Sequence, residues 1–353
     1  MKVSVVILNW NAQHLLRQFL PAVVQHSTLP EGMGEVEVVV ADNGSTDSSE
    51  AYVNTLAAQY PQRLRFLPLG QNWGFAEGYN KALEHVEAEY VVLLNDDVEV
   101  TPRWLERLVA YMDAHPEVAA CQPRLMSWKE PERFEYAGAC GGYLDRYGYP
   151  FCRGRVFSTV ETDRGQYATS SGLLWATGAC LLIRLRDYRE AGGLDGRFFA
   201  HMEEVDLCWR LCCRRREVAC VTESTVFHVG GASLAAGSPR KTYLNFRNNL
   251  LMLYKNLPDA ELRRVLLTRS ILDVVAAFVF LLKGEPKNFL AVFRARRDFR
   301  RMKPSFLPSR HDNLHAAAAA GNASMQAPGR TPFSLLWRYH IRKQDTYTQL
   351  TNL

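Results

Sequence analysis

The sequence predicts an α/β fold in which helices cover a mostly parallel sheet. Between residues 1 and 111, short apolar runs alternate with segments whose apolar residues recur at helical spacing, which is the pattern of parallel strands joined by crossover helices. Beyond residue 240 the periodicity is helical alone. A chain of 353 residues can hold one α/β domain of about 200 to 250 residues together with a helical C-terminal extension.

Each early element follows from its own pattern. The apolar residues of a strand buried on both faces form a continuous run, whereas those of a helix recur every three or four residues. The strands expected on this basis cover residues 3–8, 36–41, 64–67 and 90–94, and the helices cover residues 15–24, 51–56 and 75–86. Turn-rich segments at residues 42–47 and 70–74 follow two of these strands.

The middle of the chain is less regular. Residues 122–171 are rich in Gly, Tyr and Arg and have weak periodicity, which indicates an irregular insertion rather than a separate domain. After it we expect a strand over residues 173–183 that a Thr-Gly pair interrupts, a helix that starts at Glu203, and a strand near residues 218–223.

The C-terminal third is basic. Residues 240–303 hold 15 Lys and Arg against five acids, although the net charge of the whole chain is only +5. Basic residues among apolar runs suit either a solvated helical surface or one that contacts an anionic membrane. The apolar run 271–282 is too short to span a bilayer, which leaves a core helix or an interfacial one. Residues 311–330 are expected to form a flexible linker, and residues 333–343 either dock back or touch lipid.

Composition and cysteine usage narrow the class further. The chain has the balance of an ordinary globular protein and contains no recognised nucleic-acid module, so a nucleic-acid partner is not expected. The first apolar run is too short for a signal peptide, so we expect a cytoplasmic protein. All eight cysteines lie between Cys121 and Cys220 without a repeated pair spacing, which favours reduced thiols over disulfides or a zinc site.

Polar side chains stand at the ends of the predicted strands, where parallel sheets bind their ligands. They are Asn9, Asp42, Asn72 and the triplet Asn95-Asp96-Asp97. The two adjacent carboxylates of the triplet either hold a divalent cation that bridges phosphates or lie in a solvated loop. Asp42 either accepts a hydrogen bond from a nucleotide base or builds the turn that follows it, and the same choice applies to Asn72 before Gly74.

Three further groups are candidates for chemistry. Glu203, Glu204 and Asp206 crowd the expected start of a helix, where they either complement the helix dipole or raise the proton affinity of one member to make a general base. His228 follows a strand and precedes a Gly-Gly pair, so it is either structural or a metal or phosphate ligand. Arg247, on an otherwise apolar helix, either binds phosphate or is solvated.

Seven motifs therefore follow one another along the chain. They are VSVVILNWN at residues 3–11, DNGSTD at 42–47, NWGFA at 72–76, NDD at 95–97, TGA at 177–179, EEVDL at 203–207, and His228. In this order, over about residues 1–250, they resemble the inverting family 2 glycosyltransferases and in particular their rhamnosyltransferase-like branch. The resemblance implies a GT-A fold, a nucleotide diphospho-sugar donor, and Mg²⁺ or Mn²⁺.

The resemblance also implies a role for each motif residue. Asp97 and His228 would hold the metal, and Glu204 would be the general base. Glu203 and Asp206 would belong to the same catalytic group, although the family more often has a Glu-Asp pair where this chain has Glu203-Glu204. The donor would lie against Asn9, Asp42, Asn72, Gly74, Asp96, Gly178 and Arg247, with Asp42 at the base.

The resemblance divides the chain into three parts. Residues 1–239 would form the GT-A catalytic domain, with a nucleotide-sugar-binding half over 1–111 and an acceptor-binding half over 112–239. Residues 240–303 would form a helical, basic extension that contacts a membrane or packs on the core. Residues 304–353 would form a linker and a C-terminal tail.

The function implied is transfer of a sugar, with inversion, to a hydroxyl of a glycan or lipid-linked acceptor during cell-surface polysaccharide biosynthesis. The donor expected first is dTDP-rhamnose and next a UDP-hexose, and the protein is expected at the inner face of the cell membrane as a peripheral protein. The alternative is a non-catalytic binder of nucleotide-sugar or glycan on the same fold. A nucleotidyltransferase or dinucleotide-dependent oxidoreductase is disfavoured, because neither G-x-G-x-x-G after the first strand nor G-x-x-x-x-G-K-[ST] is present.

Overall fold

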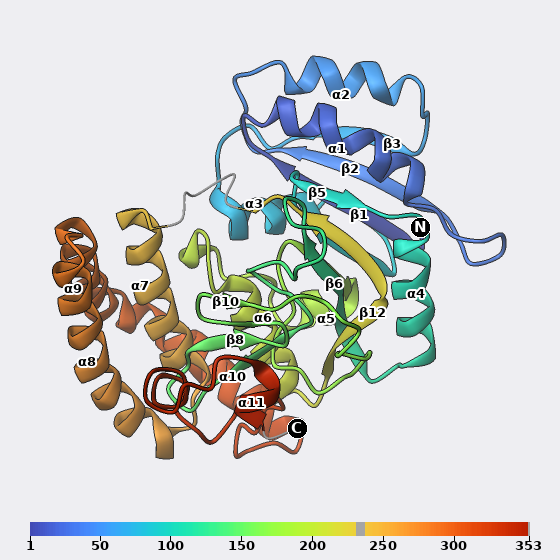
Figure 1. Ribbon diagram of the computed structural model, residues 1–353. Coiled ribbons are helices and arrows are strands. Elements are labelled where there is room, and N and C mark those ends of the chain that lie inside the picture. The colour runs from blue at the N-terminus through green and yellow to red at the C-terminus, as the bar shows by residue number, and fades with distance from the viewer. Residues whose placement is uncertain (231–236, 352–353) are drawn as a thin grey trace.

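A computed structural model of the chain describes residues 1–230 and 237–351 (Figure 1). Gly231, the second glycine after His228, lies outside the described residues, as do the last two residues of the predicted tail.

An eight-stranded sheet forms the centre of the molecule, in the order β3-β2-β1-β4-β11-β6-β12-β5. Its strands are β1 Val3–Asn9, β2 Val36–Asp42, β3 Leu64–Pro68, β4 Tyr90–Leu94, β5 Val98–Val100, β6 Val118–Ser127, β11 Cys180–Arg184 and β12 Glu217–His228. The first four strands are parallel to one another, β6 is parallel to β12, and β11 is antiparallel to both of its neighbours. The predicted mostly parallel sheet is therefore confirmed.

Helices cover both faces of this sheet because the side chains of each strand alternate between the faces. Val5 and Ile7 of β1 pack with α1 Gln13–His26, α2 Ser49–Ala57 and α4 Trp104–Ala114. Val6 points to the other face, which α3 Gly74–Leu83 and α6 Glu203–Cys213 cover. The early strands and helices thus lie where the sequence predicts them, within one to three residues at most ends.

The expected irregular insertion at residues 122–171 is wrong in two respects. It begins inside β6, a strand of the main sheet, and it contains a small antiparallel sheet of β7 Gly142–Leu144, β8 Pro150–Cys152, β9 Arg155–Val156 and β10 Thr159–Val160. The strand β6 is buried on both faces, so no alternation of polar and apolar residues reveals it. The strand expected over residues 173–183 is shorter, since β11 begins only after the Thr-Gly pair.

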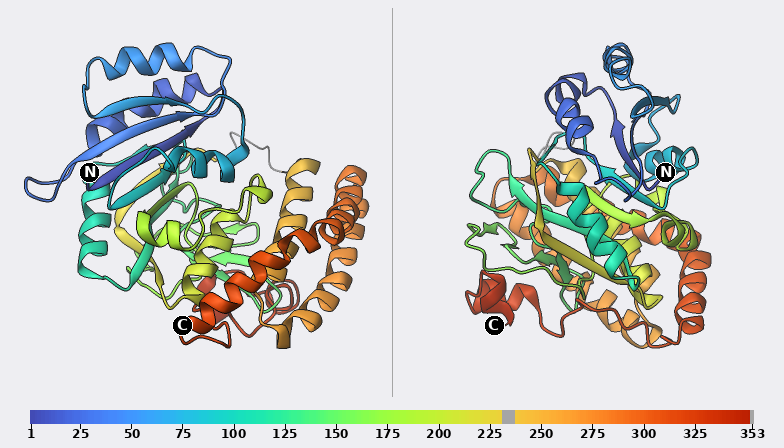
Figure 2. Two further views of the ribbon diagram at one scale, coloured as in Figure 1. Left: turned by 180° about the vertical axis from the view of Figure 1, so that it is seen from behind. Right: turned by 90° about the vertical axis from the view of Figure 1, so that its right-hand side faces the viewer.

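The C-terminal third is helical to Met302, as predicted. Its first helices are α7 Pro239–Asn256, α8 Asp259–Leu282 and α9 Pro286–Met302. They lie side by side at one edge of the molecule, with α8 and α9 outermost (Figures 1 and 2). The expectation that the run 271–282 is too short to span a membrane is wrong for the helix that contains it, because α8 has 24 residues and is long and apolar enough by length and composition.

The predicted flexible linker at residues 311–330 is wrong as well. α10, Leu307–Ala319, includes most of the alanine run, and alanine is the best helix former. The Arg310 guanidinium is buried and donates to the backbone oxygens of Tyr254 and Leu257 on the preceding helical segment. The tail docks back onto the small sheet, where Tyr339 packs edge-on against Phe157.

Candidate active site

The ends of β1 and β2 hold the first polar pair. The Asn9 amide donates to Asp42 Oδ1 at 2.8 Å, and the backbone N–H of Ser45 donates to Asp42 Oδ2 at 2.9 Å. Both side chains are buried, and Asn9 Oδ1 has no hydrogen-bond partner among the described residues. The two hydrogen bonds therefore fix the pair, and Asn9 Oδ1 is available to accept a hydrogen bond at the carboxyl edge of the sheet.

Asn72 and Gly74 form the turn that starts α3. Asn72 Oδ1 accepts from the backbone N–H of Gly74 at 2.8 Å, which is the turn-forming alternative for an asparagine. Gly74 has φ +80°, and a Cβ there would lie 2.5 Å from the ring of Phe199. Only glycine fits this position, because both the backbone angle and the aromatic contact exclude a side chain.

Asp97 and His228 meet where β4 and β12 end. His228 Nε2 lies 3.0 Å from Asp97 Oδ1, and both side chains are buried. Burial alone would lower the pKa of His228, but the carboxylates of Asp97 and Glu135 outweigh it and raise that pKa to about 10. Burial, together with the charge of Asp97, raises the pKa of the neighbouring Asp96 to about 7. The cluster thus concentrates negative charge at the end of β4.

Glu135 is a member of this cluster that the sequence did not reveal. Its Oε1 lies 3.3 Å from His228 Nδ1, and its own side chain is 7% exposed. The Ala137 backbone N–H donates to its other carboxylate oxygen and fixes its orientation. Glu135 stands in the region of weak periodicity, with no motif around it, so only the fold brings it to His228.

Glu203 and Glu204 open helix α6. Each has one buried carboxylate oxygen without a partner among the described residues. Burial raises the pKa of both, and the charge of Glu204 raises that of Glu203 further. Carboxyl groups whose pKa is raised in this way are suited to take up a proton.

Gly178 links Glu204 to the end of β4. A Cβ on Gly178 would lie 3.7 Å from Glu204 Cβ and 3.4 Å from the ring of Phe75. The next residue, Ala179, accepts a hydrogen bond through its carbonyl from the backbone N–H of Asn95 at 2.9 Å. The structure therefore brings the Thr-Gly-Ala motif, the Asn-Asp-Asp triplet and the first turn of α6 to one end of the sheet.

A comparison with known protein families matches residues 4–185 to Glycosyl transferase family 2. These residues make up more than half of the chain. The chain belongs to glycosyltransferase family 2. It therefore transfers a sugar from a nucleotide-sugar donor.

Relatives of known function agree with the predicted rhamnosyltransferase-like branch. The N-acetylglucosaminyl-diphospho-decaprenol L-rhamnosyltransferase of Mycobacterium tuberculosis is 27% identical over 227 residues, which cover 59% of this chain and 70% of the relative. The O-antigen biosynthesis protein RfbC of Myxococcus xanthus is 28% identical over 237 residues, which cover 67% of this chain and 18% of the relative.

Solved structures confirm the GT-A type of fold. GalNAc-T7 with UDP, GalNAc and Mn²⁺ matches with a TM-score of 0.58 at 14% identity, over 74% of this chain and 49% of the other. Residues 1–349 of S. aureus TarS in complex with UDP-GlcNAc match with a TM-score of 0.55 at 16% identity, over 91% and 90% of the two chains. At such identities the likeness concerns the fold.

The loop before α6 in this glycosyltransferase is held in an unusual conformation. Phe199, His201 and Met202 all have φ between +67° and +74°, which is uncommon for residues other than glycine and is found most often at functional sites. The Asn248 amide on α7 lies within hydrogen-bond distance of three carbonyl oxygens of the loop, including those of Ala200 and His201 at 2.8 Å. Helix α7 of the extension therefore holds the loop that leads into Glu203 and Glu204 in this conformation.

Arg247 supports the same loop. Its guanidinium donates to the carbonyl oxygen of Phe198 at 2.9 Å and to Asn248 Oδ1 at 2.8 Å. The side chain is buried. The structure thus uses this arginine within the protein, which neither of the two alternatives for Arg247 anticipated.

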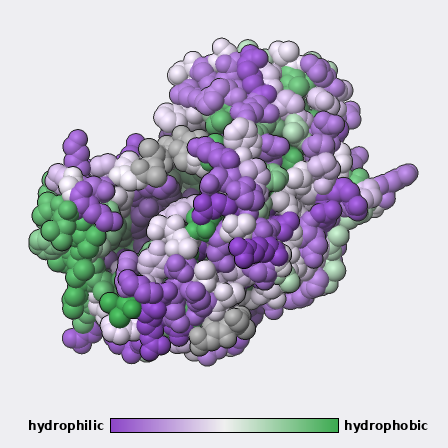
Figure 3. Space-filling view, viewed as in Figure 1, coloured by the Kyte–Doolittle hydropathy of each residue, from purple (hydrophilic) through white to green (hydrophobic). Residues whose placement is uncertain are grey.

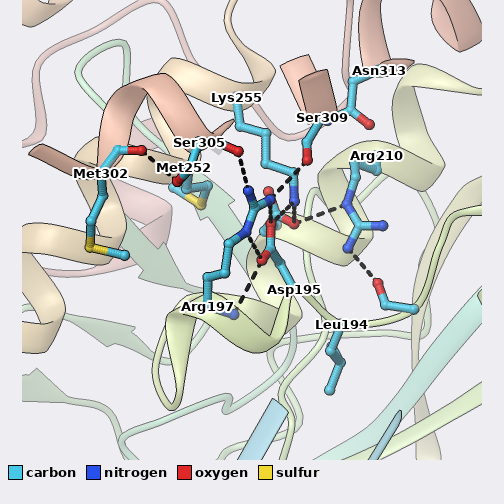
Figure 4. A network of polar contacts seen from close by, with 12 residues as sticks. Leu194, Asp195, Arg197, Arg210, Met252, Lys255, Met302, Ser305, Ser309 and Asn313 are labelled. Carbon is cyan, nitrogen blue, oxygen red and sulfur yellow. Dashed lines mark hydrogen bonds and ion pairs between the residues drawn. The ribbon is translucent and has the colours of Figure 1, made fainter. Parts of the chain in front are cut away.

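Asp206 lies in a buried ion network on the inner side of α6. It accepts from Arg210 at 2.9 Å, from Lys255 at 2.8 Å and from the Asn256 amide at 2.7 Å. Lys255 also bonds to Asp195 at 2.8 Å, and Figure 4 shows Lys255, Asp195 and Arg210 pointing toward one another. Because every partner is structural, Asp206 anchors the helix that carries Glu203 and Glu204.

The metal candidates contact each other directly. Among residues 1–230 and 237–351, no three His, Cys, Asp or Glu side chains are grouped so as to hold a metal ion. The chemistry of the end of β4 nevertheless fits a divalent cation, because two adjacent carboxylates and an imidazole meet there and the pKa of Asp96 is raised by burial and by its neighbour's charge. A hard cation takes oxygen ligands and also accepts imidazole, and it would relieve this crowding of charge.

Proposed function

We propose that this glycosyltransferase inverts the configuration at the transferred sugar in a single displacement. The observation that carries the proposal is the pair of acidic side chains, Glu203 and Glu204, whose pKa values are raised by burial. Of the two, Glu204 stands beside Gly178, near the end of β4. Glu204 takes the proton of the acceptor hydroxyl. The acceptor oxygen then bonds to the anomeric carbon, and the bond from that carbon to the diphosphate oxygen breaks.

The donor is held at the carboxyl ends of the first strands. Asp42 accepts from the nucleotide base, with Asn9 bonded beside it, and the turn of Asn72 and Gly74 lies at the next strand end. The position of Gly178 between Phe75 and the first turn of α6 supports its role in admitting the sugar close to the backbone. Arg247 contributes indirectly, through the loop before α6.

A divalent cation, Mg²⁺ or Mn²⁺, completes the site. Asp97 and His228 would hold it, and Asp96 would assist. The cation would neutralise the charge that develops on the diphosphate leaving group. The direct 3.0 Å contact between His228 and Asp97 supports this assignment, because it shows that the two side chains reach a common point.

Substrate class follows from the relatives. We propose rhamnose from a dTDP donor as the first candidate and UDP-hexoses as the next, since one relative is named as a rhamnosyltransferase. The acceptor would be a glycan or a lipid-linked sugar, because that relative acts on N-acetylglucosaminyl-diphospho-decaprenol and another takes part in O-antigen biosynthesis. The protein would work at the cytoplasmic face of the cell membrane, as a peripheral protein, in polysaccharide biosynthesis.

A thermal-shift screen against nucleotide sugars tests the donor. A donor that binds only the folded state raises the unfolding temperature, and at 100 times its Kd the gain is about 2.7 kcal/mol. We expect a dTDP- or UDP-sugar to raise it, and to raise it more with Mn²⁺ than without. Transfer to an acceptor from the best donor then separates the enzyme from a non-catalytic binder, which would show the shift without turnover. No shift with any donor contradicts the proposal.

A further inference from the structure

The outer face of helices α8 and α9 carries an unpartnered apolar surface. Along α8, large apolar side chains recur every three or four residues and are more than two-fifths exposed, and α9 adds one more. We call the set the apolar ridge: Leu267, Ile271, Val275, Phe278, Leu282 and Leu290. Figure 3 shows it as the broadest hydrophobic area on that side of the molecule. A contiguous apolar surface on a folded protein marks an interaction site when it is larger than the scattered apolar residues of an ordinary surface.

We propose that the apolar ridge inserts into the surface of a bilayer that contains anionic phospholipids. Exposed positive side chains border the ridge: Lys283 and Lys287 at the turn between the helices, and Arg294 and Arg297 along α9. Two carboxylates stand among these four cations: Asp298 lies 3.0 Å from Arg297 and 3.9 Å from Arg294, and Glu285 is at the turn. The border of the ridge therefore keeps a net positive charge. Apolar side chains beside basic ones are typical of a helix that lies in the membrane interface.

A hollow on α9 is suited to a lipid head group. Its volume is about 380 Å³, and three of its lining side chains are Lys287, Arg294 and Arg297, beside Leu290 of the ridge. A phosphate there would meet positive charge, while the acyl chains of the same lipid would meet the ridge. The hollow therefore favours an anionic bilayer over a neutral one.

The opposite face of α8 shows that the helix lies along the membrane rather than across it. Arg269 and Asp273 are buried, their side chains are bonded at 3.1 Å, and Arg296 of α9 joins them. Arg269 also donates to the carbonyl oxygen of Tyr147 in the catalytic domain at 3.0 Å. A spanning α8 would detach these contacts and expose charged groups to hydrocarbon, which is costly.

The part of the ridge at the turn between α8 and α9, which holds Leu282 and Leu290, lies at the same end of the molecule as the active site. Asn288, at the start of α9, donates to the carbonyl oxygen of Gly237 at 3.0 Å, just before α7. In the first turn of α7, Arg240 stacks over the ring of Phe199, which in turn contacts Gly74. Membrane attachment would thus hold the site near the bilayer surface. This consequence rests on the proposed lipid-linked acceptor, whereas the attachment itself does not.

Vesicle flotation tests the attachment. We expect the full chain to float with vesicles of phosphatidylcholine and phosphatidylglycerol, and to float less with phosphatidylcholine alone or at high salt. The triple variant Ile271→Glu, Leu282→Glu, Leu290→Glu should bind at least about tenfold more weakly, because it places charges on the inserted face. Trp337→Glu with Ile341→Glu, which changes two equally exposed apolar residues of the tail, is the matched control and should bind as the wild type does.

A fluorescent probe gives a second, local readout. All eight native cysteines are buried, so a dye sensitive to polarity can be attached selectively at Leu282→Cys. Its emission should shift to the blue when anionic vesicles are added, whereas the same dye at Glu50→Cys on α2 should not respond. An unshifted emission at Leu282→Cys, or flotation of the triple variant equal to that of the wild type, overturns the proposal.

Transfer assays separate this inference from the proposed function. With a short soluble acceptor, wild type and triple variant should have equal activity, and with a lipid-linked acceptor in vesicles the variant should lose at least about tenfold. If neither protein transfers sugar to either acceptor while the wild type still floats, the proposed function is wrong and the proposed membrane attachment is supported. If the wild type does not float but forms a dimer that the triple variant abolishes, the ridge is an interface between copies and the membrane proposal is wrong.

Discussion

The side-chain amide of Asn248 donates to the backbone carbonyl of His201 at 2.8 Å. Through this bond, helix α7 of the extension holds the loop that leads into Glu203 and Glu204. The loop keeps a left-handed backbone at His201 and Met202, which costs free energy of order 1–3 kcal/mol per residue unless the surroundings impose it.

Replacing Asn248 by Ala should therefore affect catalysis as well as stability. Loss of the bonds leaves buried carbonyl groups unpaired, so we expect the free energy of unfolding to fall by about 1–3 kcal/mol. A misplaced first turn of α6 should lower kcat by about 100-fold while the affinity for donor changes little. Asn54→Ala, on the exposed side of α2, is the control and should change neither quantity. Equal kcat for the two variants would show that the loop needs no support from α7.

Replacing Glu204 by Gln should remove the general base and keep its shape. We expect kcat to fall by about 10²- to 10⁴-fold, with donor binding in a thermal-shift assay unchanged. Glu190→Gln, an exposed residue at the end of α5 (Leu185–Glu190), should retain full activity. If Glu204→Gln turns over at close to the wild-type rate and Glu203→Gln does not, the base is Glu203.

Replacing His228 by Ala should weaken metal binding. The variant removes one proposed ligand, the imidazole that lies between the carboxylates of Asp97 and Glu135. We expect the affinity for Mn²⁺ in the presence of UDP, measured by calorimetry, to fall by at least about tenfold. Glu99→Gln, an exposed change on β5, is the control.

The neighbour Glu135 gives a graded version of the same test. Glu135→Gln keeps His228 but removes the carboxylate beside its Nδ1. Groups of this kind orient a ligand and raise its basicity, so the loss of Mn²⁺ affinity should be about 10- to 100-fold. Unchanged affinity in both variants would exclude His228 from the metal site.

The stability of the enzyme should depend on pH through His201. Burial, and to a smaller extent the charge of Lys241, lowers the pKa of His201 to about 4, whereas a histidine in the unfolded chain has a pKa of about 6.5. Between these values the unfolded state binds more protons, so the free energy of unfolding falls as the pH is lowered from about 6.5 to about 4, by ~3 kcal/mol at most.

Comparison of urea unfolding for the wild type and His201→Asn checks this dependence. Asparagine tolerates the left-handed backbone of the position, so the variant should keep the loop and lose the slope. The difference in stability between the two proteins should shrink as the pH falls through this window. A constant difference would mean that His201 does not carry the pH dependence.

The parallel half of the fold could be predicted because its signals are local. The buried strand that ends at Asn9 and the strand that ends at Leu94 are continuous apolar runs, and a Gly-punctuated segment marks the turn at residues 70–74. The polar residues at these strand ends also converge, because parallel strands end at one edge of a sheet. The periodicity of the sequence predicts where these residues lie in the fold, whereas their roles at the site come only from the resemblance to the family.

The rest depends on contacts between distant parts of the chain. Nothing near Glu135 in sequence indicates His228, and nothing near Asp206 indicates Lys255. From sequence alone, the run of alanines predicts a flexible linker. In the structure Arg310 and Asn313, near this run, bond to buried groups of α7, and the run is helical. Helix propensity and tertiary contacts together decide that segment, and only the first of them is local.

The bonds that α7 makes to Asp206 bear on how this enzyme can be altered. Lys255 and Asn256 satisfy a carboxylate in the first turn of α6 that would otherwise be buried with Arg210 alone. A chimera that joins the sheet of this protein to the C-terminal helices of another, cut near residue 240, would lose those partners. Exchange of acceptor specificity between relatives should therefore succeed only when α6 and α7 are transplanted as one unit.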